Sequence, residues 1–265
     1  MIVANMATYP QRRSGLEAAV HALLPQVDRL NLVLNEYNTP PDELKGIDGL
    51  NCIIPKEDTK DVGKFYPDVA DAEWVLFVDD DIIYPADYVK LTVERARKLE
   101  SRCILGGYHT SIYRRPRLRL EIESLRRCSI YWLRWWKVAN LREVTSFRDH
   151  VAETFFVDQI GTGAAIMAGH LMPPYGFMRT SQKFVDVRLA LWCFEKGILP
   201  VALPREANWL STEDDEQSIF RTFTTRHHRH VAKEIWRFAF KRRYIGEKFD
   251  MNNRYLPTQE EAGMA

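Results

Sequence analysis

Three consecutive carboxylates, Asp79, Asp80 and Asp81, form the segment of this sequence that is best suited to chemistry. They directly follow the continuous apolar run 74–78, which is typical of a strand buried on both faces of a parallel sheet. Ligands of open α/β sheets bind outside the carboxyl ends of the strands. Adjacent carboxylates repel one another unless a cation neutralises them, and such oxygen ligands select Mg²⁺ or Mn²⁺. The triplet therefore predicts a divalent-cation site, and the alternative is a solvated acidic turn before a helix that opens at Pro85.

The elements that must position this triplet are indicated by short apolar runs that alternate with helical patterns. Strands are expected at 2–4, 30–34, 52–54, 74–78 and 103–105, and helices at about 14–24 and 85–100. This alternation predicts an open α/β sheet with right-handed crossovers. The second half is less regular, with strand, glycine and strand at 155–167, a helix at 183–196, a strand at 199–203, an acidic loop at 213–216 and a basic helix at about 228–244.

Composition and motifs exclude several classes of protein. The 265 residues are 46% hydrophobic and 28% charged with a net charge of +1, which excludes a disordered chain and gives no overall attraction to a polyanion. The four cysteines form no CxxC pair, Gly63-Lys64 lacks the earlier glycine of a phosphate-binding P-loop, and Gly161-Thr162-Gly163 lacks the third glycine of the dinucleotide fingerprint. No apolar run nears the roughly 20 residues of a membrane span and no signal peptide is evident, so we expect a cytoplasmic protein.

Further segments occur in a fixed order around the triplet. They are residues 6–12, 24–28, 34–37, 63–66, 78–88 and 161–163, followed by Asp186, Pro204-Arg205 and Trp209. Together they resemble the donor loops and DxD segment of nucleotide-sugar-dependent glycosyltransferases with the GT-A fold, especially the family 2 domains of bacterial capsule polymerases of the chondroitin-synthase type. The likeness covers about 1–112 and 155–210. It implies a GT-A domain at 1–212, a Rossmann-like open mixed sheet flanked by helices with a helical basic insertion at 113–154, followed by an acidic loop, basic helix and tail at 213–265.

The resemblance implies an inverting transfer of a sugar from a nucleoside diphosphate, with a UDP-sugar as the expected donor, to a hydroxyl of a glycan or lipid-linked acceptor in bacterial cell-surface polysaccharide synthesis. It implies Mn²⁺ or Mg²⁺ on Asp81, with Asp79 as a further ligand. His109 is added as a candidate ligand because it follows Gly106-Gly107-Tyr108 at the end of a predicted strand on the same side. The residues expected to bind the donor are Thr8, Tyr9, Arg12, Asn35, Lys64, Asp79 and Asp80. Those expected on the acceptor side are Gly161, Thr162 and Gly163.

An inverting transfer needs a carboxylate that accepts the proton of the acceptor hydroxyl. The resemblance places this general base at Asp186, near the start of the helix expected at 183–196. The preceding residue is Val185, where the commoner form of the motif has a second acid. Glu153 and Asp158 are therefore alternative bases, and Asp186 has the alternative role of an acid favoured by the helix dipole.

Two segments concentrate positive charge. Residues 114–148 contain ten Arg or Lys against three Glu together with Trp132, Trp135 and Trp136, and residues 221–246 contain eight against one Glu. Such segments bind the inner face of an anionic membrane, stack on sugars, or bind nucleic acid, and the tryptophans alternatively form a core. Membrane contact and no nucleic-acid partner are expected for a glycosyltransferase; the competing interpretation is a metal-dependent nucleotidyltransferase or a nucleic-acid-binding protein.

Overall fold

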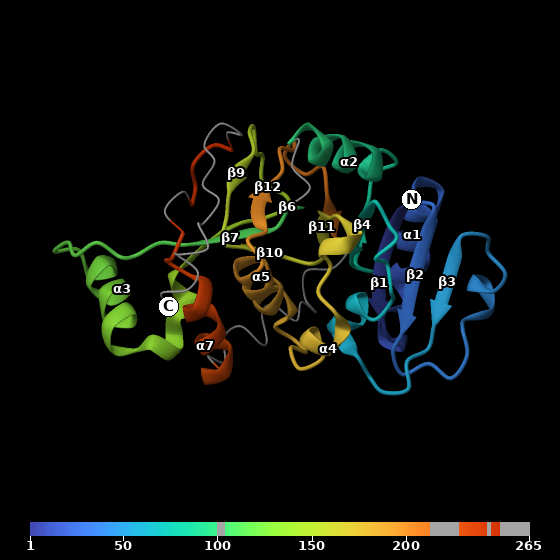
Figure 1. Cartoon of the computed structure of the whole chain (residues 1–265), viewed down its shortest axis with the longest axis horizontal. Coiled ribbons are helices and arrows are strands. Elements are labelled where there is room, and N and C mark those ends of the chain that lie inside the picture. Colours follow the sequence, from blue (N-terminus) through green and yellow to red (C-terminus); the bar gives the residue numbers. More distant parts are fainter. Residues whose placement is uncertain (100–103, 213–227, 243–244, 250–265) are drawn as a thin grey trace.

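A computed structural model describes residues 1–99, 104–212, 228–242 and 245–249, and its centre is an eight-stranded mixed sheet (Figure 1). The strand order is β3-β2-β1-β4-β11-β6-β12-β9. These strands are β1 (Ile2–Thr8), β2 (Arg29–Leu34), β3 (Leu50–Ile53), β4 (Trp74–Val78), β6 (Ile104–Gly107), β9 (Phe155–Phe156), β11 (Ala164–Met167) and β12 (Leu199–Ala202). The predicted strand at 74–78 is confirmed, residue for residue.

The directions of the strands make the sheet mixed. Strands β1, β2, β3 and β4 are mutually parallel where they pair, whereas β11 is antiparallel to both β4 and β6. Strand β12 pairs in parallel with β6, and β9 is antiparallel to β12. The predicted α/β class, an open mixed sheet flanked by helices, is confirmed.

Helices cover both faces of the sheet because successive strand residues point to opposite sides. On one side, residues such as Ala4 and Leu76 pack under α1 (Arg13–Leu23) and α2 (Tyr88–Lys98). On the other side, residues such as Val3 and Phe77 pack under the 3₁₀ segment η4 (Lys60–Phe65), α4 (Tyr175–Met178) and α5 (Val185–Glu195). Continuous apolar strands are therefore required, as the run 74–78 predicted.

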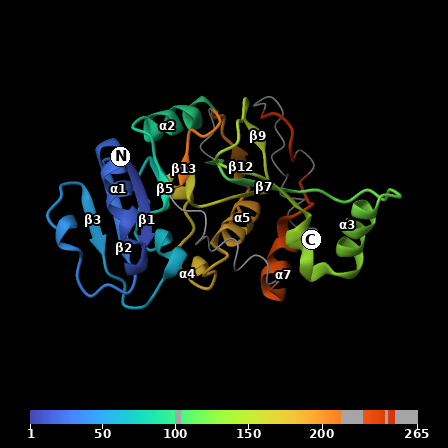
Figure 2. The ribbon, with the colours of Figure 1, turned by 180° about the vertical axis from the view of Figure 1, so that it is seen from behind.

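Smaller elements complete the described fold (Figure 2). Strands β10 (Gln159–Ile160), β7 (Thr110–Tyr113) and β8 (Arg142–Thr145) form a second sheet, and β13 (Ser211–Thr212) pairs with β5 (Ile82–Ile83). The insertion predicted to be helical contains α3 (Ile122–Leu133), the 3₁₀ segment η5 (Trp135–Leu141) and the strand β8. Its helical character is correct, but the strand was missed because four residues that alternate weakly in polarity give little periodic signal.

A third apolar core joins the insertion to the C-terminal helix α7 (Arg229–Phe238). Ile130 of α3, Val138 of η5, Leu191 of α5 and Ile235 of α7 are buried together in it. Helix α7 is shorter than predicted because Ala239 has an extended backbone and Phe240 a φ of 66°, outside the helical region. The division at 212/213 stays a prediction, since residues 213–227, which follow it, lie outside the described residues.

Two further predictions concern helix bounds and membrane spans. Helix α2 begins at Tyr88 rather than at Pro85, whose carbonyl instead accepts a turn hydrogen bond from the Tyr88 N–H at 3.0 Å. None of the described helices combines the length and apolar character that a bilayer crossing requires.

Candidate active site

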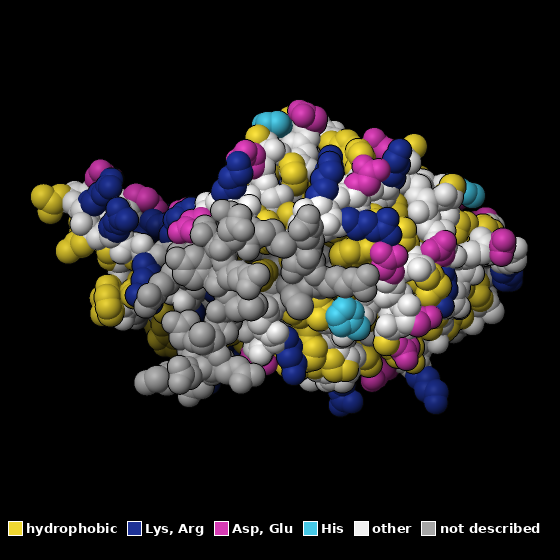
Figure 3. Space-filling view, turned by 45° about the horizontal axis from the view of Figure 1, so that its top comes forward, with side chains coloured by type: hydrophobic (Ala, Val, Ile, Leu, Met, Phe, Trp, Pro, Cys, Tyr) yellow, Lys and Arg dark blue, Asp and Glu magenta, His cyan; other side chains and the backbone are white. Residues whose placement is uncertain are grey.

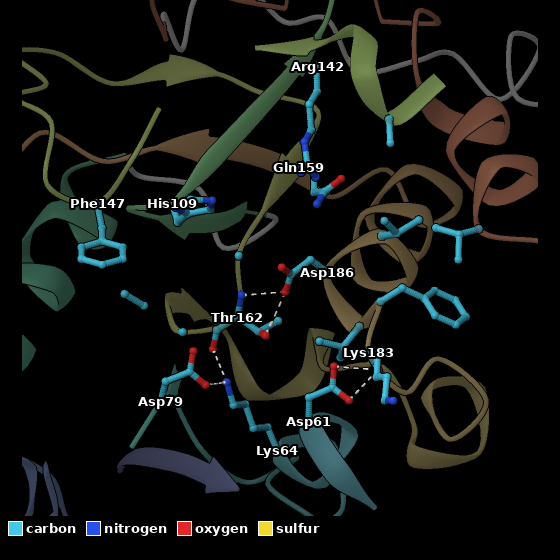
Figure 4. A pocket seen from close by; sticks show the side chains of 18 of the residues that line it. Asp61, Lys64, Asp79, His109, Arg142, Phe147, Gln159, Thr162, Lys183 and Asp186 are labelled. Atoms are coloured by element: carbon cyan, nitrogen blue, oxygen red, sulfur yellow. Dashed lines mark hydrogen bonds and ion pairs between the residues drawn. The ribbon is translucent and has the colours of Figure 1, made fainter. Parts of the chain in front are cut away.

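A pocket of about 400 Å³ lies at the carboxyl end of β4, between the turn 161–163 and the start of α5 (Figure 4). A second pocket of about 270 Å³ adjoins it, beside the end of β1. The residues that line both are Arg12, Asp61, Lys64, Asp79 and Lys183. The two pockets therefore meet at charged side chains, at the edge of the sheet where the sequence predicted a ligand site.

The three carboxylates of the triplet have different surroundings. The side chain of Asp80 is only 2% exposed, and its oxygens accept hydrogen bonds from Thr8 Oγ1 at 2.6 Å and from Arg12 Nη1 at 3.0 Å. Asp81 accepts a bond from the same Arg12 nitrogen at 2.8 Å, and Asp79 pairs with the Lys64 ammonium. The side chains of Asp79 and Asp81 are 36% and 39% exposed. Asp80 thus anchors the turn, while the other two carboxylates line the larger pocket.

Burial and mutual repulsion alter the acidity of this group. Burial raises the pKa of Asp81 to about 6, and the charge of Asp79 acts in the same direction against the opposing charge of Arg12. Burial also raises the pKa of Asp80, although the Thr8 hydrogen bond and the Arg12 charge oppose it. Burial alone would lower the Arg12 pKa, but the charges of Asp80 and Asp81 outweigh it and that pKa is raised. Three carboxylates and two fixed cations leave one negative charge in excess.

Close backbone contacts fix the triplet in place. Tyr84 Oη accepts a hydrogen bond from the Asp79 N–H at 2.8 Å and donates one to the Gly163 carbonyl at 2.7 Å. A Cβ at Gly163 would collide with the Asp79 carboxylate, and a Cβ at Gly15 in α1 would lie 2.7 Å from the Asp80 carbonyl oxygen. These contacts explain why both positions are glycine. The sequence analysis did not single out Tyr84, whose role depends on Gly163, far along the chain.

Thr162 connects the triplet to the predicted base. Lys64 Nζ, which pairs with Asp79, also donates to the Thr162 carbonyl at 3.0 Å. The Thr162 N–H and hydroxyl both donate to Oδ1 of Asp186 at 2.9 Å. Figure 4 shows this run of contacts across the floor of the pocket. These contacts, from Asp79 through Lys64 and Thr162, set the position of Asp186 relative to the triplet.

Asp186, the predicted base, lies at the edge of the larger pocket. It lies in the first turn of α5 and lines the larger pocket. Thr162 donates both of its hydrogen bonds to Oδ1, and none of the described residues donates one to Oδ2. The alternative bases lie elsewhere: Glu153 is exposed and pairs with Lys248 at 2.6 Å, and buried Asp158 accepts the Tyr113 N–H at 2.7 Å. Neither lines either pocket.

The predicted metal ligands are not all brought together. Among the described residues, no three His, Cys, Asp or Glu side chains converge on one ion position, so His109 does not complete a set with Asp79 and Asp81. His109 lines the same pocket, where burial lowers its pKa and favours the neutral imidazole. Mg²⁺ and Mn²⁺ commonly take one or two protein carboxylates and complete their coordination with water and substrate phosphate. Asp79 and Asp81, both facing the pocket with a negative charge in excess, fit such an ion.

The residues predicted to bind the donor gather at the second pocket. Thr8, Tyr9, Arg12 and Asn35 line it together with Lys64, Asp79 and Asp80. Asn35 shapes the wall, since Oδ1 accepts the Thr59 N–H at 2.8 Å and Nδ2 donates to the Lys60 carbonyl at 3.1 Å. The Arg12 guanidinium lies 5.7 Å from the centre of the Tyr9 ring. The ordered motifs of the sequence thus meet in space, although Thr8 and Asn35 are occupied by protein partners.

Asp61 is a site residue that the sequence analysis missed. It lies in η4, lines both pockets, and accepts the Lys183 N–H with its two carboxylate oxygens at 2.8 and 2.9 Å. Burial raises its pKa to about 6. The only signal in the sequence was its place beside Lys64 in a loop already assigned to the donor.

The two basic segments differ in structure. Trp135 and Trp136 pack partly buried against α7, as the core alternative predicted, whereas Trp132 is 76% exposed. In the C-terminal segment, Arg237 pairs with Glu195 of α5, and Arg242 donates to the Ile198 carbonyl at 3.1 Å. Other basic residues of that segment, at 221, 226 and 243, lie outside the described residues, as does the acidic loop 213–216.

Comparisons with known proteins give a likeness in structure and none in sequence. The sequence matches no protein-family model and no curated protein. The structure is similar to that of S. aureus TarS 1-349 in complex with UDP-GlcNAc, with a TM-score of 0.49 and 10% sequence identity, over 89% of this chain and 67% of that chain. A likeness at this level assigns no function, and the fold class is given by the order and directions of the strands themselves.

Proposed function

We propose that this chain is an inverting, metal-assisted glycosyltransferase that moves a sugar from a nucleoside diphosphate to a hydroxyl of a glycan or lipid-linked acceptor. The observation that carries the proposal is the run of contacts from Asp79 through Lys64 and Thr162 to Asp186. It supports the proposal because it joins three groups that line one pocket: Asp79, proposed to bind the cation, the ammonium of Lys64, and Asp186, proposed as the base. In an inverting transfer a base accepts the proton of the acceptor hydroxyl, and positive charge stabilises the diphosphate as it leaves.

The reaction follows from these positions. The acceptor hydroxyl loses its proton to Asp186 while its oxygen attacks the anomeric carbon of the donor sugar. The bond from that carbon to the diphosphate breaks, and its electron pair leaves with the nucleoside diphosphate. A divalent cation bound by Asp79 and Asp81 would stabilise the charge that develops on this leaving group. Lys64 supplies further fixed positive charge without reorganisation, because its ammonium is already held by Asp79 and the Thr162 carbonyl.

The donor and acceptor sides are distinguished by their linings. The pocket of about 270 Å³ contains the predicted donor residues and is proposed for the nucleoside. The pocket of about 400 Å³ extends from Asp186 to apolar side chains of η5, α5 and α7, which are Trp136, Ala139, Val187, Val231 and Ile235. We assign this larger pocket to the donor sugar and the acceptor, with Asp186 beside the acceptor hydroxyl.

A thermal-shift panel tests the proposal. UDP-, GDP- and dTDP-sugars with Mn²⁺ are compared with nucleoside triphosphates and with single-stranded oligonucleotides. A ligand at a hundredfold excess over its Kd stabilises the protein by about 2.7 kcal/mol, which for a chain of this size raises Tm by roughly 5 °C. We expect this shift with at least one nucleotide sugar, and a larger shift with metal than without it.

The same panel separates the competing class. A nucleotidyltransferase or nucleic-acid-binding protein responds to triphosphates or oligonucleotides and not to the sugar attached to a diphosphate. A response confined to those ligands would contradict the glycosyltransferase assignment. The Asp81→Asn variant serves as the matched control for the effect of the metal. It removes a proposed metal ligand that is partly exposed and does not contribute to the core.

A further inference from the structure

One end of the molecule is an arm, residues 114–134, that carries α3 away from the sheet (Figures 1 and 2). Six of the eleven exposed large hydrophobic residues in the described chain lie on it. They are Leu118 (77%), Leu120 (99%), Ile122 (87%), Leu125 (45%), Trp132 (76%) and Leu133 (74%). Single exposed apolar residues need no explanation, but a cluster of this kind marks an interaction surface.

The exposed apolar residues of α3 lie on one side of the helix. Ile122, Leu125, Trp132 and Leu133 follow one another at spacings of three, seven and one residues, which brings them to the same side of a helix with 3.6 residues per turn. Cys128 and Ile130, on the remaining surface, are the residues of α3 that are buried. Helix α3 therefore has apolar residues that pack against the protein and a second set of apolar residues exposed to solvent.

The same arm is strongly basic. It contains seven arginines against Glu121 and Glu123. Within the described residues, Arg117, Arg119 and Arg134 have no ion-pair partner, and Arg126 has only an exposed contact of 3.4 Å to Glu123. Figure 3 shows hydrophobic and basic side chains next to each other on this projection. A partner of the arm must therefore accept apolar side chains and supply negative charge at the same time.

We propose that the arm is a docking surface for the anionic face of a lipid bilayer. Aliphatic Leu and Ile side chains enter the acyl boundary while the arginines reach the headgroups, as in interfacial amphipathic helices. Nucleic acid fits less well, because five of the six exposed residues are aliphatic and offer no ring for base stacking. A second copy of the chain fits less well, because it would bring two arms of the same charge together.

The surface differs from the one expected from the sequence. In the C-terminal segment Arg237 pairs with Glu195 and Arg242 donates to the Ile198 carbonyl, and two of the three expected tryptophans are packed inward. The arm continues directly into η5, whose Trp136 and Ala139 line the larger pocket. Bilayer docking by the arm therefore selects the lipid-linked acceptor over a free glycan, and this last step rests on the proposed glycosyltransferase function.

Sedimentation with vesicles tests the docking surface without any substrate. Vesicles of phosphatidylcholine with phosphatidylglycerol at 7:3 are compared with pure phosphatidylcholine, at low and at high NaCl. Each cation near an anionic surface contributes about 1 kcal/mol, and 1.4 kcal/mol is tenfold, so the triple variant Arg117→Gln, Arg119→Gln, Arg134→Gln should bind roughly a hundredfold more weakly at low salt. The variant Leu120→Ser, Ile122→Ser should lose the binding that persists at high salt.

Both variants change exposed residues and should keep the far-ultraviolet circular dichroism of the wild type. The matched control is Ile54→Ser, Lys56→Gln, an exposed apolar residue and an exposed lysine away from the arm, which should bind like the wild type. Wild-type protein that ignores anionic vesicles at low salt overturns the proposal. So does a dimer in solution that the arm variants dissociate, or an oligonucleotide complex that they abolish. Donor-induced thermal shifts, measured separately, decide the proposed function and do not depend on this outcome.

Discussion

Replacing Lys64 by methionine removes one ammonium from the centre of the site and keeps a side chain of similar length. The Lys64 side chain is only 2% exposed, pairs with Asp79, and donates to the Thr162 carbonyl at 3.0 Å. The Lys64→Met variant therefore leaves a carboxylate and a carbonyl without this donor. Because Thr162 also holds Asp186, the change reaches both halves of the proposed chemistry.

The expected loss of stability follows from these contacts. Removal of one partner from a buried ion pair costs about 3–5 kcal/mol, but Asp79 is 36% exposed and water can replace part of the interaction, so we take about 2 kcal/mol for the pair. The lost hydrogen bond to the Thr162 carbonyl adds about 1 kcal/mol. A total of about 3 kcal/mol corresponds to a fall in Tm of roughly 6 °C for a chain of this size.

A second substitution separates the structural effect from the functional one. The double variant Lys64→Met, Asp79→Asn removes the unpaired charge and should recover most of the lost stability in urea unfolding. It should not recover the thermal shift produced by a nucleotide sugar, because it lacks the ammonium that faces the diphosphate and one carboxylate of the proposed cation site. The control is Lys90→Met, an exposed lysine on α2, which should match the wild type in both measurements.

Either of two results would contradict the roles proposed for Lys64. If the Lys64→Met variant had the same midpoint of urea unfolding as the wild type, the pair with Asp79 would not stabilise the fold. A double variant that regains stability and donor binding together would reduce Lys64 to a structural counter-ion, and the diphosphate would then need another cation.

Three further predictions concern single carboxylates. Asp81→Asn should keep the fold but lose transfer activity that depends on a divalent cation, and full wild-type turnover in excess chelator would contradict a role for the metal. Asp186→Asn should bind the donor normally but transfer the sugar at least a hundredfold more slowly, as loss of a general base does, while Glu153→Gln in the same assay should be unaffected. Burial raises the pKa of Asp158 from 3.8 to about 6, so the folded state binds this proton more tightly than the unfolded state. Wild-type protein should therefore gain stability relative to Asp158→Asn as pH falls from 7 to 4, by up to about 3 kcal/mol in urea unfolding; a constant difference would show that this carboxylate is not desolvated.

Local patterns were sufficient to predict the first half of the fold. The run 74–78 gave a strand buried on both faces because apolar side chains are required under helices on either side. The alternation of strands and helices then placed Asp79, Asp80 and Asp81 at the edge of the sheet where ligands bind. Periodicity failed for the short strands β5, β7, β8 and β13, whose two to four residues carry too little pattern.

The sequence by itself determined that three carboxylates follow a buried strand, and the tertiary structure alone decided what each of them can do. Thr8 and Arg12, more than sixty residues away in the chain, hold Asp80 away from the larger pocket, while Asp79 and Asp81 line it. Asp61 likewise lines the site because the fold brings it to Lys183, which is distant in sequence and donates a backbone hydrogen bond to it. The burial and pairing of these side chains depend on which distant segments come into contact, and local residue patterns do not specify those contacts.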